Sequence, residues 1–405
     1  QHPLGIITFM SKHFNTILFD GPERSQLLPF TYIRPVAELR IGIDTLREKW
    51  EAFLGQECSF ATQNYLSSKY QLHNADLNYF INPTYIPTRS LAIQVKNLKE
   101  NQVLIFDSNP VAFCTTNSIL PSDTSGFNEI DVEQELIQIK NCSDLFVHNA
   151  EVLAQDFKRL TKDRMSQVLG DTNRVINPEQ VFVEPGARVS CAILNASEGP
   201  IFIGADAQIM EGSMLRGPLA ICKNSVVKMG AKIYGGTTIG PNAKVGGELN
   251  NVLFLGNSNK GHDGFLGNAV IGEWCNIGAA TDASNLKNNY SKIRIWNYVS
   301  ENFAKTELQF CGLLMGDYSR CGIHSMFNTA TVIGVNSNVF GTGFPRTFIP
   351  SYSYGGAQGF QTYAFAKAME SNNAMMERKG SKLTDHDIQI LETIFDTTAV
   401  WRKDS

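Results

Sequence analysis

The chain has 405 residues, of which 43% are hydrophobic and 18% are charged, and its formal net charge is −4. This length allows two or more domains with a large core, and the slight acidity gives no support for bulk nucleic-acid binding. No apolar run approaches the roughly 18 residues that a membrane-spanning helix needs. The eight cysteines are scattered without a CxxC pair, which suits the reducing environment of the cytoplasm.

The segment before the first expected strand, residues 1–14, contains a short apolar run with no basic stretch ahead of it. We interpret it as a leader or a frayed end rather than a signal peptide. Residues 15–165 have the mixed pattern of an α/β domain. Short apolar runs predict strands at 16–19, 78–81 and 103–106, and helical spacing predicts helices at 41–53 and 150–165.

A polar connector is expected at 166–180, and a six-residue repeat follows it. The longest unbroken run of the repeat places apolar residues at Ile203, Ile209, Leu215, Ile221, Val227, Ile233, Ile239 and Val245. A helix needs an apolar spacing of about 3.6 residues and a strand a spacing of about 2, whereas a period of six fits a coil with three flat faces. The repeat therefore predicts a left-handed parallel β-helix with coils stacked about 4.8 Å apart.

The repeat is interrupted near 248–264 and 282–307, where we expect loops to leave the coils and carry function. The β-helix is assigned to 181–356, and a helical tail to 357–405. Thr384 and Asp387 have the spacing of a capping box at the start of the second tail helix. The predicted fold class is thus an α/β, Rossmann-like domain followed by an all-β left-handed parallel β-helix of hexapeptide repeats and short C-terminal helices.

The segment 18–35 follows the first predicted strand and contains Gly21, Arg24 and Thr31 near the spacings of a known loop. It resembles the G-x-G-x-R-x-x-P-x-T-x-x-x-P-K loop of sugar-1-phosphate nucleotidyltransferases. The resemblance implies a nucleotidyltransferase-like domain in which Gly21, Arg24, Thr31 and Arg34 bind the phosphates of a nucleoside triphosphate that reacts with a sugar 1-phosphate. A turn of this kind holds phosphate through backbone N–H groups, and an arginine offsets its charge.

Two features of the nucleotidyltransferase family differ in this chain. Val36 stands where the family has a lysine, and Asn82 follows the strand at 78–81 where the family often has a magnesium-binding aspartate. Asp107, which follows the strand at 103–106, is the expected substitute. The resemblance implies Mg²⁺ as the cofactor of nucleotidyl transfer.

A second resemblance lies in the β-helix, in S-N-K-G-H-D-G-F-L-G-N-A-V-I-G at 258–272 and N-I-G-A-A-T at 276–281. These motifs are similar to those of the acetyltransferase half of bifunctional GlmU enzymes. The resemblance implies that His262 is the general base that takes a proton from a sugar amine as the amine attacks acetyl-CoA. It also implies that Asn276 and Asn285 contact the sugar and orient the base. Histidine suits the role because its pKa lies near working pH.

The same resemblance implies a surface around His262 that binds CoA and sugar. Ala279 and Ala280 match the small-residue stretch along which the CoA arm lies. Phe265 stands where the family has a tyrosine that contacts phosphate, and Lys260 is expected to supply phosphate charge.

The chain as a whole resembles a GlmU-like family of sugar nucleotidyltransferases found in Bacteroidetes-type bacteria. Three hypotheses stay open: nucleotidyl transfer, acetyl transfer to an amino sugar, or a catalytically reduced protein that binds a nucleotide sugar. The first two are compatible within one chain. The long repeat also predicts a homotrimer, because β-helices of this type usually bury one face against two copies and build sites between them.

Overall fold

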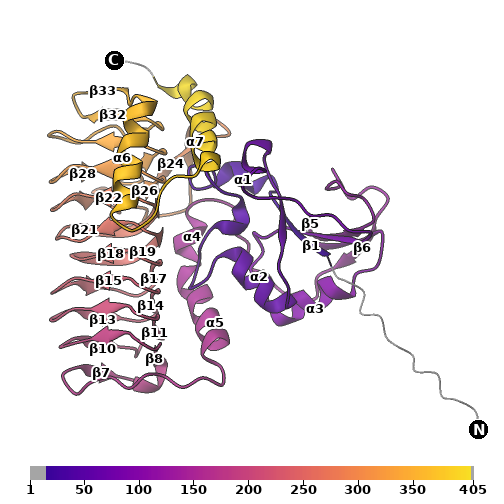
Figure 1. The fold of residues 1–405 in the computed structure, drawn as a ribbon, viewed down its shortest axis with the longest axis horizontal. Coiled ribbons are helices and arrows are strands. Elements are labelled where there is room, and N and C mark those ends of the chain that lie inside the picture. Colours follow the sequence, from indigo (N-terminus) through magenta and orange to yellow (C-terminus); the bar gives the residue numbers. More distant parts are fainter. Residues whose placement is uncertain (1–14, 403–405) are drawn as a thin grey trace, which may run out of the picture.

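A computed structural model describes residues 15–402 and divides into an N-terminal α/β domain, a β-helix beside it and two helices at the C-terminal end (Figure 1). This arrangement confirms the predicted fold class. The leader expected at 1–14 lies outside the described residues. Within 15–402, no helix has the length and apolarity required to cross a bilayer.

The first domain is built on a mixed six-stranded sheet with the order β2-β1-β3-β5-β4-β6. β1 pairs in parallel with β2 and β3, whereas β5 runs antiparallel to β3 and β4. β1, β3 and β4 therefore end at the same edge of the sheet. The strand bounds are β1 Asn15–Phe19, β2 Ser59–Ala61, β3 Asn78–Ile81, β4 Gln102–Phe106, β5 Asn109–Thr115 and β6 Asn128–Asp131.

The helices of this domain begin and end at recognisable signals. The helix expected at 41–53 begins later, where Thr45 and Glu48 form a capping box, and it ends at Gly55 with a φ of 76°. The bounds are α1 Glu23–Gln26, α2 Leu46–Leu54, α3 Arg89–Asn97, α4 Asp144–Val147 and α5 Asn149–Thr161, with 3-10 turns at Val36–Glu38 and Asn64–Leu66.

The β-helix advances by 18 residues per coil, since Ile203 pairs with Ile221 and Ile221 pairs with Ile239. These residues point inward and join one continuous apolar core. Each coil has three short sides, which stack into three faces that we call A, B and C. The first strand, β7, lies within the segment predicted as the connector.

Face A turns toward the first domain. Its strands are β8 Val181–Val183, β11 Ile201–Ile203, β14 Leu219–Ile221, β17 Thr237–Ile239, the second halves of β19 Glu248–Gly256 and β21 Phe265–Glu273, then β26 Leu314–Met315, β29 Val332–Ile333 and β31 Phe348–Ile349. The 3-10 turn Pro178–Gln180 precedes β8.

Face B carries the second hexapeptide of each coil. Its strands are β9 Arg188–Val189, β12 Gln208–Ile209, β15 Val226–Val227, β18 Lys244–Val245, β20 Asn259–Lys260, β22 Asn276–Ile277, β27 Arg320–Cys321, β30 Asn338–Val339, β32 Ser353–Gly356 and β33 Gly359–Thr362.

Face C completes the coils. Its strands are β7 Arg174–Ile176, β10 Ile193–Asn195, β13 Met214–Arg216, β16 Lys232–Ile233, the first halves of β19 and β21, then β23 Asp282–Ala283 and β28 Met326–Phe327.

The predicted interruption at 248–264 is wrong. β19 and β20 run through it in register with the coils on either side. The repeat was hidden because Leu249 follows Val245 by four residues and Lys260 takes an inward position. The interruption predicted at 282–307 contains a hairpin, β24 Arg294–Asn297 and β25 Asn302–Lys305, that leaves the coils.

The tail consists of α6 Phe365–Glu377, α7 Asp385–Thr397 and a 3-10 turn at Ala399–Trp401. The capping box of Thr384 and Asp387 is confirmed. Arg320 on face B donates to Asn372 of α6 at 2.9 Å, and Lys69 of the first domain pairs with Asp387 of α7 at 2.8 Å. The tail therefore contacts both domains.

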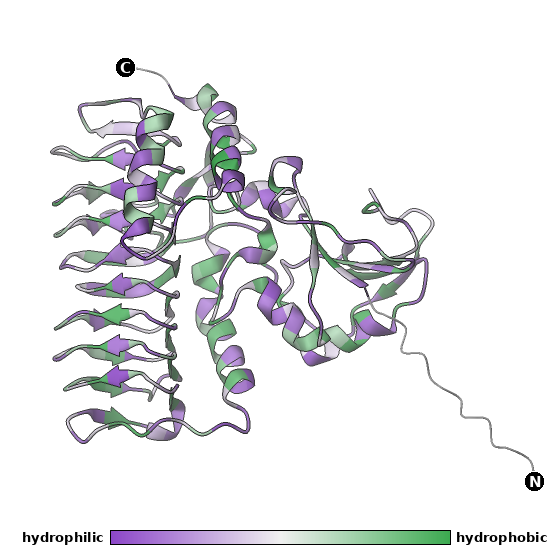
Figure 2. Ribbon diagram, viewed as in Figure 1, coloured by the Kyte–Doolittle hydropathy of each residue, from purple (hydrophilic) through white to green (hydrophobic). Residues whose placement is uncertain are grey.

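Face A and the first domain pack against each other through apolar residues. Phe182 and Phe202 stack at 6.0 Å and pack with Leu153 and Phe157 of α5. Figure 2 shows hydrophobic residues along α4 and α5, which run beside the β-helix. Burial of this area fixes the two domains against each other.

One buried ion pair crosses the interface. Arg34 donates to Asp317 Oδ1 at 2.7 Å and to Glu273 Oε2 at 3.1 Å. Burial disfavours the charge on Arg34, but the two carboxylates outweigh it and raise the pKa of the guanidinium. Arg34 thus remains charged and joins the loop after β1 to face A.

We expect Asp317→Asn to destabilise the chain by about 3–5 kcal/mol, because it leaves Arg34 buried without its main counter-ion. Urea unfolding at pH 7, followed by fluorescence, measures the change. Glu307→Gln is the control: it removes an exposed ion pair with Lys292 and should cost less than about 1 kcal/mol. Equal unfolding midpoints for Asp317→Asn and the parent chain would contradict this role.

Candidate functional site

The loop after β1 is closed by Asp20. Its carboxylate accepts from Val36 N at 2.8 Å and from the hydroxyl of Thr62, and it pairs with Arg24 at 3.2 Å. Burial raises the pKa of Asp20 despite these donors. The loop is therefore held by its own side chains.

Arg24 and Thr31, both expected at the phosphates, contact each other inside this loop. The Arg24 guanidinium donates to the carbonyl of Thr31 at 2.6 Å and to Tyr65 Oη at 2.7 Å. The Thr31 hydroxyl in turn donates to the carbonyl of Arg24 at 2.8 Å. Both side chains are buried. Like Arg34, Arg24 already has acidic and carbonyl partners, so neither arginine is free to receive a phosphate in this arrangement.

The common edge at which β1, β3 and β4 end carries a polar cluster. Glu23 accepts from Gln138 Nε2 at 2.8 Å, and Asn82 Nδ2 lies 3.4 Å from Glu23 Oε2. Gly21 lies against both, because a Cβ there would come within 2.5 Å of Glu23 Oε2 and 3.2 Å of Asn82 Nδ2. Ligands of open α/β sheets bind at such an edge.

Two carboxylates of this edge share a neighbour. Tyr85 is fully buried, and its hydroxyl has no partner among the described residues. Burial, and then the charges of Glu23 and Asp107, raise the pKa of Tyr85. The predicted metal ligand Asp107 therefore lies within electrostatic reach of the same hydroxyl as Glu23.

These residues fit Mg²⁺ only as an ion shared with a substrate. Proteins often hold Mg²⁺ by one or two carboxylates together with substrate phosphates, and Glu23 offers one such carboxylate at this edge. Across residues 15–402, no group of three or more His, Cys, Asp or Glu side chains is placed to hold a metal. The edge is thus not a preformed metal cage.

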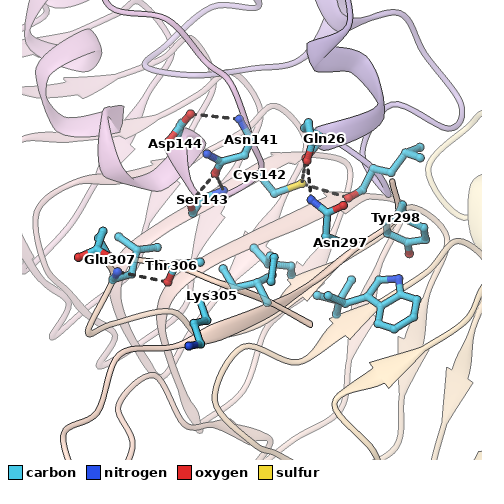
Figure 3. A pocket seen from close by; sticks show the side chains of 17 residues that line it. Gln26, Asn141, Cys142, Ser143, Asp144, Asn297, Tyr298, Lys305, Thr306 and Glu307 are labelled. Atoms are coloured by element: carbon cyan, nitrogen blue, oxygen red, sulfur yellow. Dashed lines mark hydrogen bonds between the residues drawn. The ribbon is translucent and has the colours of Figure 1, made fainter. Parts of the chain in front are cut away.

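A cavity of about 390 Å³ lies between the domains, next to α1 (Figure 3). Gln26, Leu28 and the segment 141–144 line it from the first domain, and the β24–β25 hairpin lines it from the β-helix. Asn297 Nδ2 donates to Gln26 Oε1 at 2.5 Å, which ties the hairpin to α1.

The cavity combines apolar and uncharged polar surfaces. Ile295, Leu314 and Val332 contribute apolar surface, while Gln26 and Asn141 contribute amides. The buried Tyr298 hydroxyl and Trp296 indole N–H, on two further lining residues, have no partner within 15–402. The charged lining residues are Asp144, Lys305 and Glu307, which have a net negative charge. Such a lining suits a hydroxylated, uncharged group better than a triphosphate.

In the β-helix, His262 lies exposed in the turn between β20 and β21. The turn is held from inside by Lys260, which is 1% exposed and donates to the carbonyls of His262 at 2.9 Å and Gly246 at 3.2 Å. Burial lowers the pKa of Lys260 to about 8. Lys260 therefore supports the turn instead of presenting its charge at the surface.

The other predicted acyl-transfer residues surround this corner without converging on one point. Ala280 N donates to the carbonyl of Asp263 at 2.9 Å, so Ala279 and Ala280 form the next turn of the same corner. Asn276 is exposed on face B. Asn285 donates to Asn268 at 2.9 Å, beside face C. Phe265 begins β21 and is half-buried.

Several residues of these sites were not singled out from the sequence. Glu23 carried a signal, since it is an acidic residue between Gly21 and Arg24 of the loop. Lys260 was expected to supply phosphate charge, but its burial was not predicted, although a lysine six residues after Phe254 breaks the inward apolar pattern. Gln26, Asn297 and Asp317 carried none, because their partners are more than 250 residues away in sequence.

Residues 16–165 match a protein family described as sugar nucleotidyl transferase. The match ends before the first strand of the β-helix. It confirms the predicted type of the first domain and, with it, the assignment to the transferases.

Three solved structures are similar at low identity. An Arabidopsis UDP-N-acetylglucosamine acyltransferase is 12% identical with a TM-score of 0.23, and the alignment covers 58% of this chain and 99% of that one. Another UDP-N-acetylglucosamine acyltransferase is 10% identical with a TM-score of 0.22, covering 58% and 80%. A variant of AntD, an N-acyltransferase from Bacillus cereus in complex with dTDP and coenzyme A, is 15% identical with a TM-score of 0.22, covering 55% and 96%.

Lys260 generates a pH prediction. Below pH 8 the lysine is charged in both the folded and unfolded states, and burial destabilises the fold by about 3 kcal/mol. Between pH 8 and the unfolded value of 10.5, the folded state loses its proton first, so this penalty fades as pH rises. Lys260→Met removes this penalty, so its free energy of unfolding should exceed that of the parent chain by an amount that decreases between pH 7.5 and pH 10. Thermal unfolding at several pH values measures it, with the exposed Lys162→Met as control; parallel profiles for Lys260→Met and the parent would refute it.

Proposed function

We propose that this chain is a sugar nucleotidyltransferase, joining a sugar 1-phosphate to a nucleoside triphosphate at the edge where β1, β3 and β4 end. The family match over 16–165 is the observation that carries the proposal. Glu23, Asn82 and Gln138 supply a polar cluster at that edge. Mg²⁺, when bound, offsets the charge of the reacting phosphates.

The residues of the chain orient the reactants in this proposal. Gly21 lets a ligand approach the backbone closely, since a side chain there would meet Glu23. Asn82 and Gln138 fix the Glu23 carboxylate by their amide groups. The interdomain cavity begins three residues further on, at Gln26, and receives the uncharged sugar ring. The phosphate oxygen of the sugar 1-phosphate attacks the α-phosphorus, the α–β bridging bond breaks, and pyrophosphate leaves.

We expect Glu23→Gln to lower the rate of pyrophosphate release by about a hundredfold, because it removes a carboxylate that would hold Mg²⁺ at the reacting phosphates. The assay supplies UTP or dTTP with a panel of sugar 1-phosphates. Glu133→Gln, an exposed change in the same domain, should keep full activity. Full activity in Glu23→Gln, or no release by the parent chain with any pair, would reject this assignment.

The His262 corner favours a second activity, acyl transfer from acetyl-CoA to an amino sugar. Its support is the exposed imidazole on a glycine-flanked turn that Lys260 holds from inside. A neutral imidazole accepts the proton that the amine loses as its nitrogen attacks the thioester carbonyl; the C–S bond then breaks and the CoA thiol leaves. In this proposal face C, with exposed Ile193, Met214 and Tyr234, packs against other copies in a homotrimer.

We expect His262→Ala to lower acetyl transfer by about 10²–10⁴-fold while the trimer and the melting temperature stay nearly unchanged. Thiol release from acetyl-CoA with a panel of amino sugars measures the rate, and light scattering measures the assembly. His386→Ala, on the exposed side of α7, is the matched control. If the parent chain binds a nucleotide sugar but turns over no amino sugar, acyl transfer is excluded and His262 is a structural residue.

A further inference from the structure

A second large cavity, of about 530 Å³, lies at the corner of the β-helix between faces A and B. The turns before β15, β18, β20 and β22 form its wall, and the connection between α6 and α7 covers it. Its lining contains three basic residues, Lys244, Arg378 and Lys379, and no aspartate or glutamate. None of the predicted site residues belongs to it.

Asparagines line the corner as a chain of amides. Asn224, Asn242 and Asn257 occupy equivalent turn positions, each with a φ between 56° and 59°. Asn224 Nδ2 donates to Asn242 Oδ1 at 3.2 Å, and Asn242 Nδ2 donates to Asn257 Oδ1 at 3.2 Å. The chain of donors therefore ends at Asn257 Nδ2, which makes no hydrogen bond to any residue of 15–402.

Lys379 attaches the helical tail to this corner. Its Nζ donates to the carbonyls of Asn242 at 2.8 Å and Asn257 at 2.7 Å, and it lies 5.8 Å from the ring centre of Trp274. Burial, and then the charge of Lys244, lower the pKa of Lys379 to about 8. The two lysines therefore repel each other across the cavity.

The remaining cations are unpaired. The side chains of Lys244 and Arg378 are exposed and make no hydrogen bond or ion pair to the described part of the chain. The end of α6 explains Arg378 and Lys379 in part, because cations are favourable at a helix C-terminus. The helix end does not explain Lys244, which comes from β18. It also does not explain why every charged residue of the lining is basic when the chain has a net charge of −4.

We propose that this corner cavity binds the phosphate group of a nucleotide-like ligand. Arg378 can donate two parallel hydrogen bonds to phosphate oxygens, and Lys244 supplies a second charge from the opposite wall. Asn257 Nδ2 and the Ser381 hydroxyl add neutral donors. A bound phosphate would also relieve the repulsion between Lys244 and Lys379.

The position of the cavity restricts the ligand further. From Asn257 at this corner to His262 at the next, the coil runs for five residues, or about 16 Å of extended chain across face B. A ligand with phosphate at one end and a long flexible arm can span that distance. Coenzyme A has this shape, whereas a nucleoside diphosphate sugar offers the same phosphate chemistry without the thiol arm.

Calorimetry on the full chain at low salt tests the site with coenzyme A, dephospho-coenzyme A, adenosine 3′,5′-bisphosphate and UDP-N-acetylglucosamine. The test variant is Lys244→Gln/Arg378→Gln. Lys232→Gln/Lys367→Gln removes the same charge elsewhere on the surface and is the control. We expect the test variant to weaken binding of at least one ligand by about ten- to a hundredfold with an unchanged melting temperature, and the control to leave affinity within about twofold.

The ligand panel identifies the source of the phosphate. Weaker binding of dephospho-coenzyme A than of coenzyme A would assign the site to the 3′-phosphate, and preference for UDP-N-acetylglucosamine would assign it to a nucleotide sugar. The proposal is overturned if the parent chain binds none of these ligands, if the test variant binds as tightly as the parent, or if the control loses as much affinity. Adenosine 3′,5′-bisphosphate lacks both the sugar and the arm that reaches His262, so Glu23→Gln and His262→Ala should retain its binding, and failure of either activity is distinguishable from failure of the site.

Discussion

The ion pair between Arg34 and Asp317 is the constraint on which the arrangement of the two domains depends. It links residues 283 positions apart in a buried setting, where a wrong pairing would leave a charge without a partner. Such a contact permits little sliding of one domain along the other, whereas the apolar surface around it is non-directional. The position of the interdomain cavity follows from this pair, since Asn297 reaches Gln26 only when face A is in register with the loop after β1.

The pair also changes what the loop after β1 can do. The family resemblance places arginines of this loop at phosphates, yet Arg24 is held by Asp20, and Arg34 by Asp317 and Glu273. Cations paired in this way stabilise the structure, and in this arrangement they are not free to neutralise a ligand. In the proposed nucleotidyl transfer, phosphate charge must therefore be offset mainly by an ion that arrives with the substrate.

The β-helix was largely predictable because its repeat is local. Each inward residue is fixed by a neighbour six positions away, so Ile203 to Val245 identify their own coils. The prediction failed at 248–264, where the inward position is taken by Lys260. The burial of a charged residue is decided by the carbonyls of Gly246 and His262 around it, which hydropathy does not represent. The three strands expected in the first domain were found for the same local reason, since short apolar runs mark them.

The candidate site was less predictable, because its geometry depends on contacts between distant segments. The sequence identified His262 and the loop after β1, but not that Lys260 would turn inward or that Gln26 would meet Asn297.

The pairing of the cations differs between the first domain and the corner of the β-helix. In the first domain Arg24, Arg34 and Lys49 are buried and paired with Asp20, Asp317 and Asp156, while the exposed Lys244 and Arg378 at the β-helix corner have no acidic partner. Buried charges require partners, whereas exposed cations of one sign gathered around a cavity attract an anion. The exposed cations around this corner cavity are therefore without acidic partners, whereas the arginines of the loop after β1 are paired.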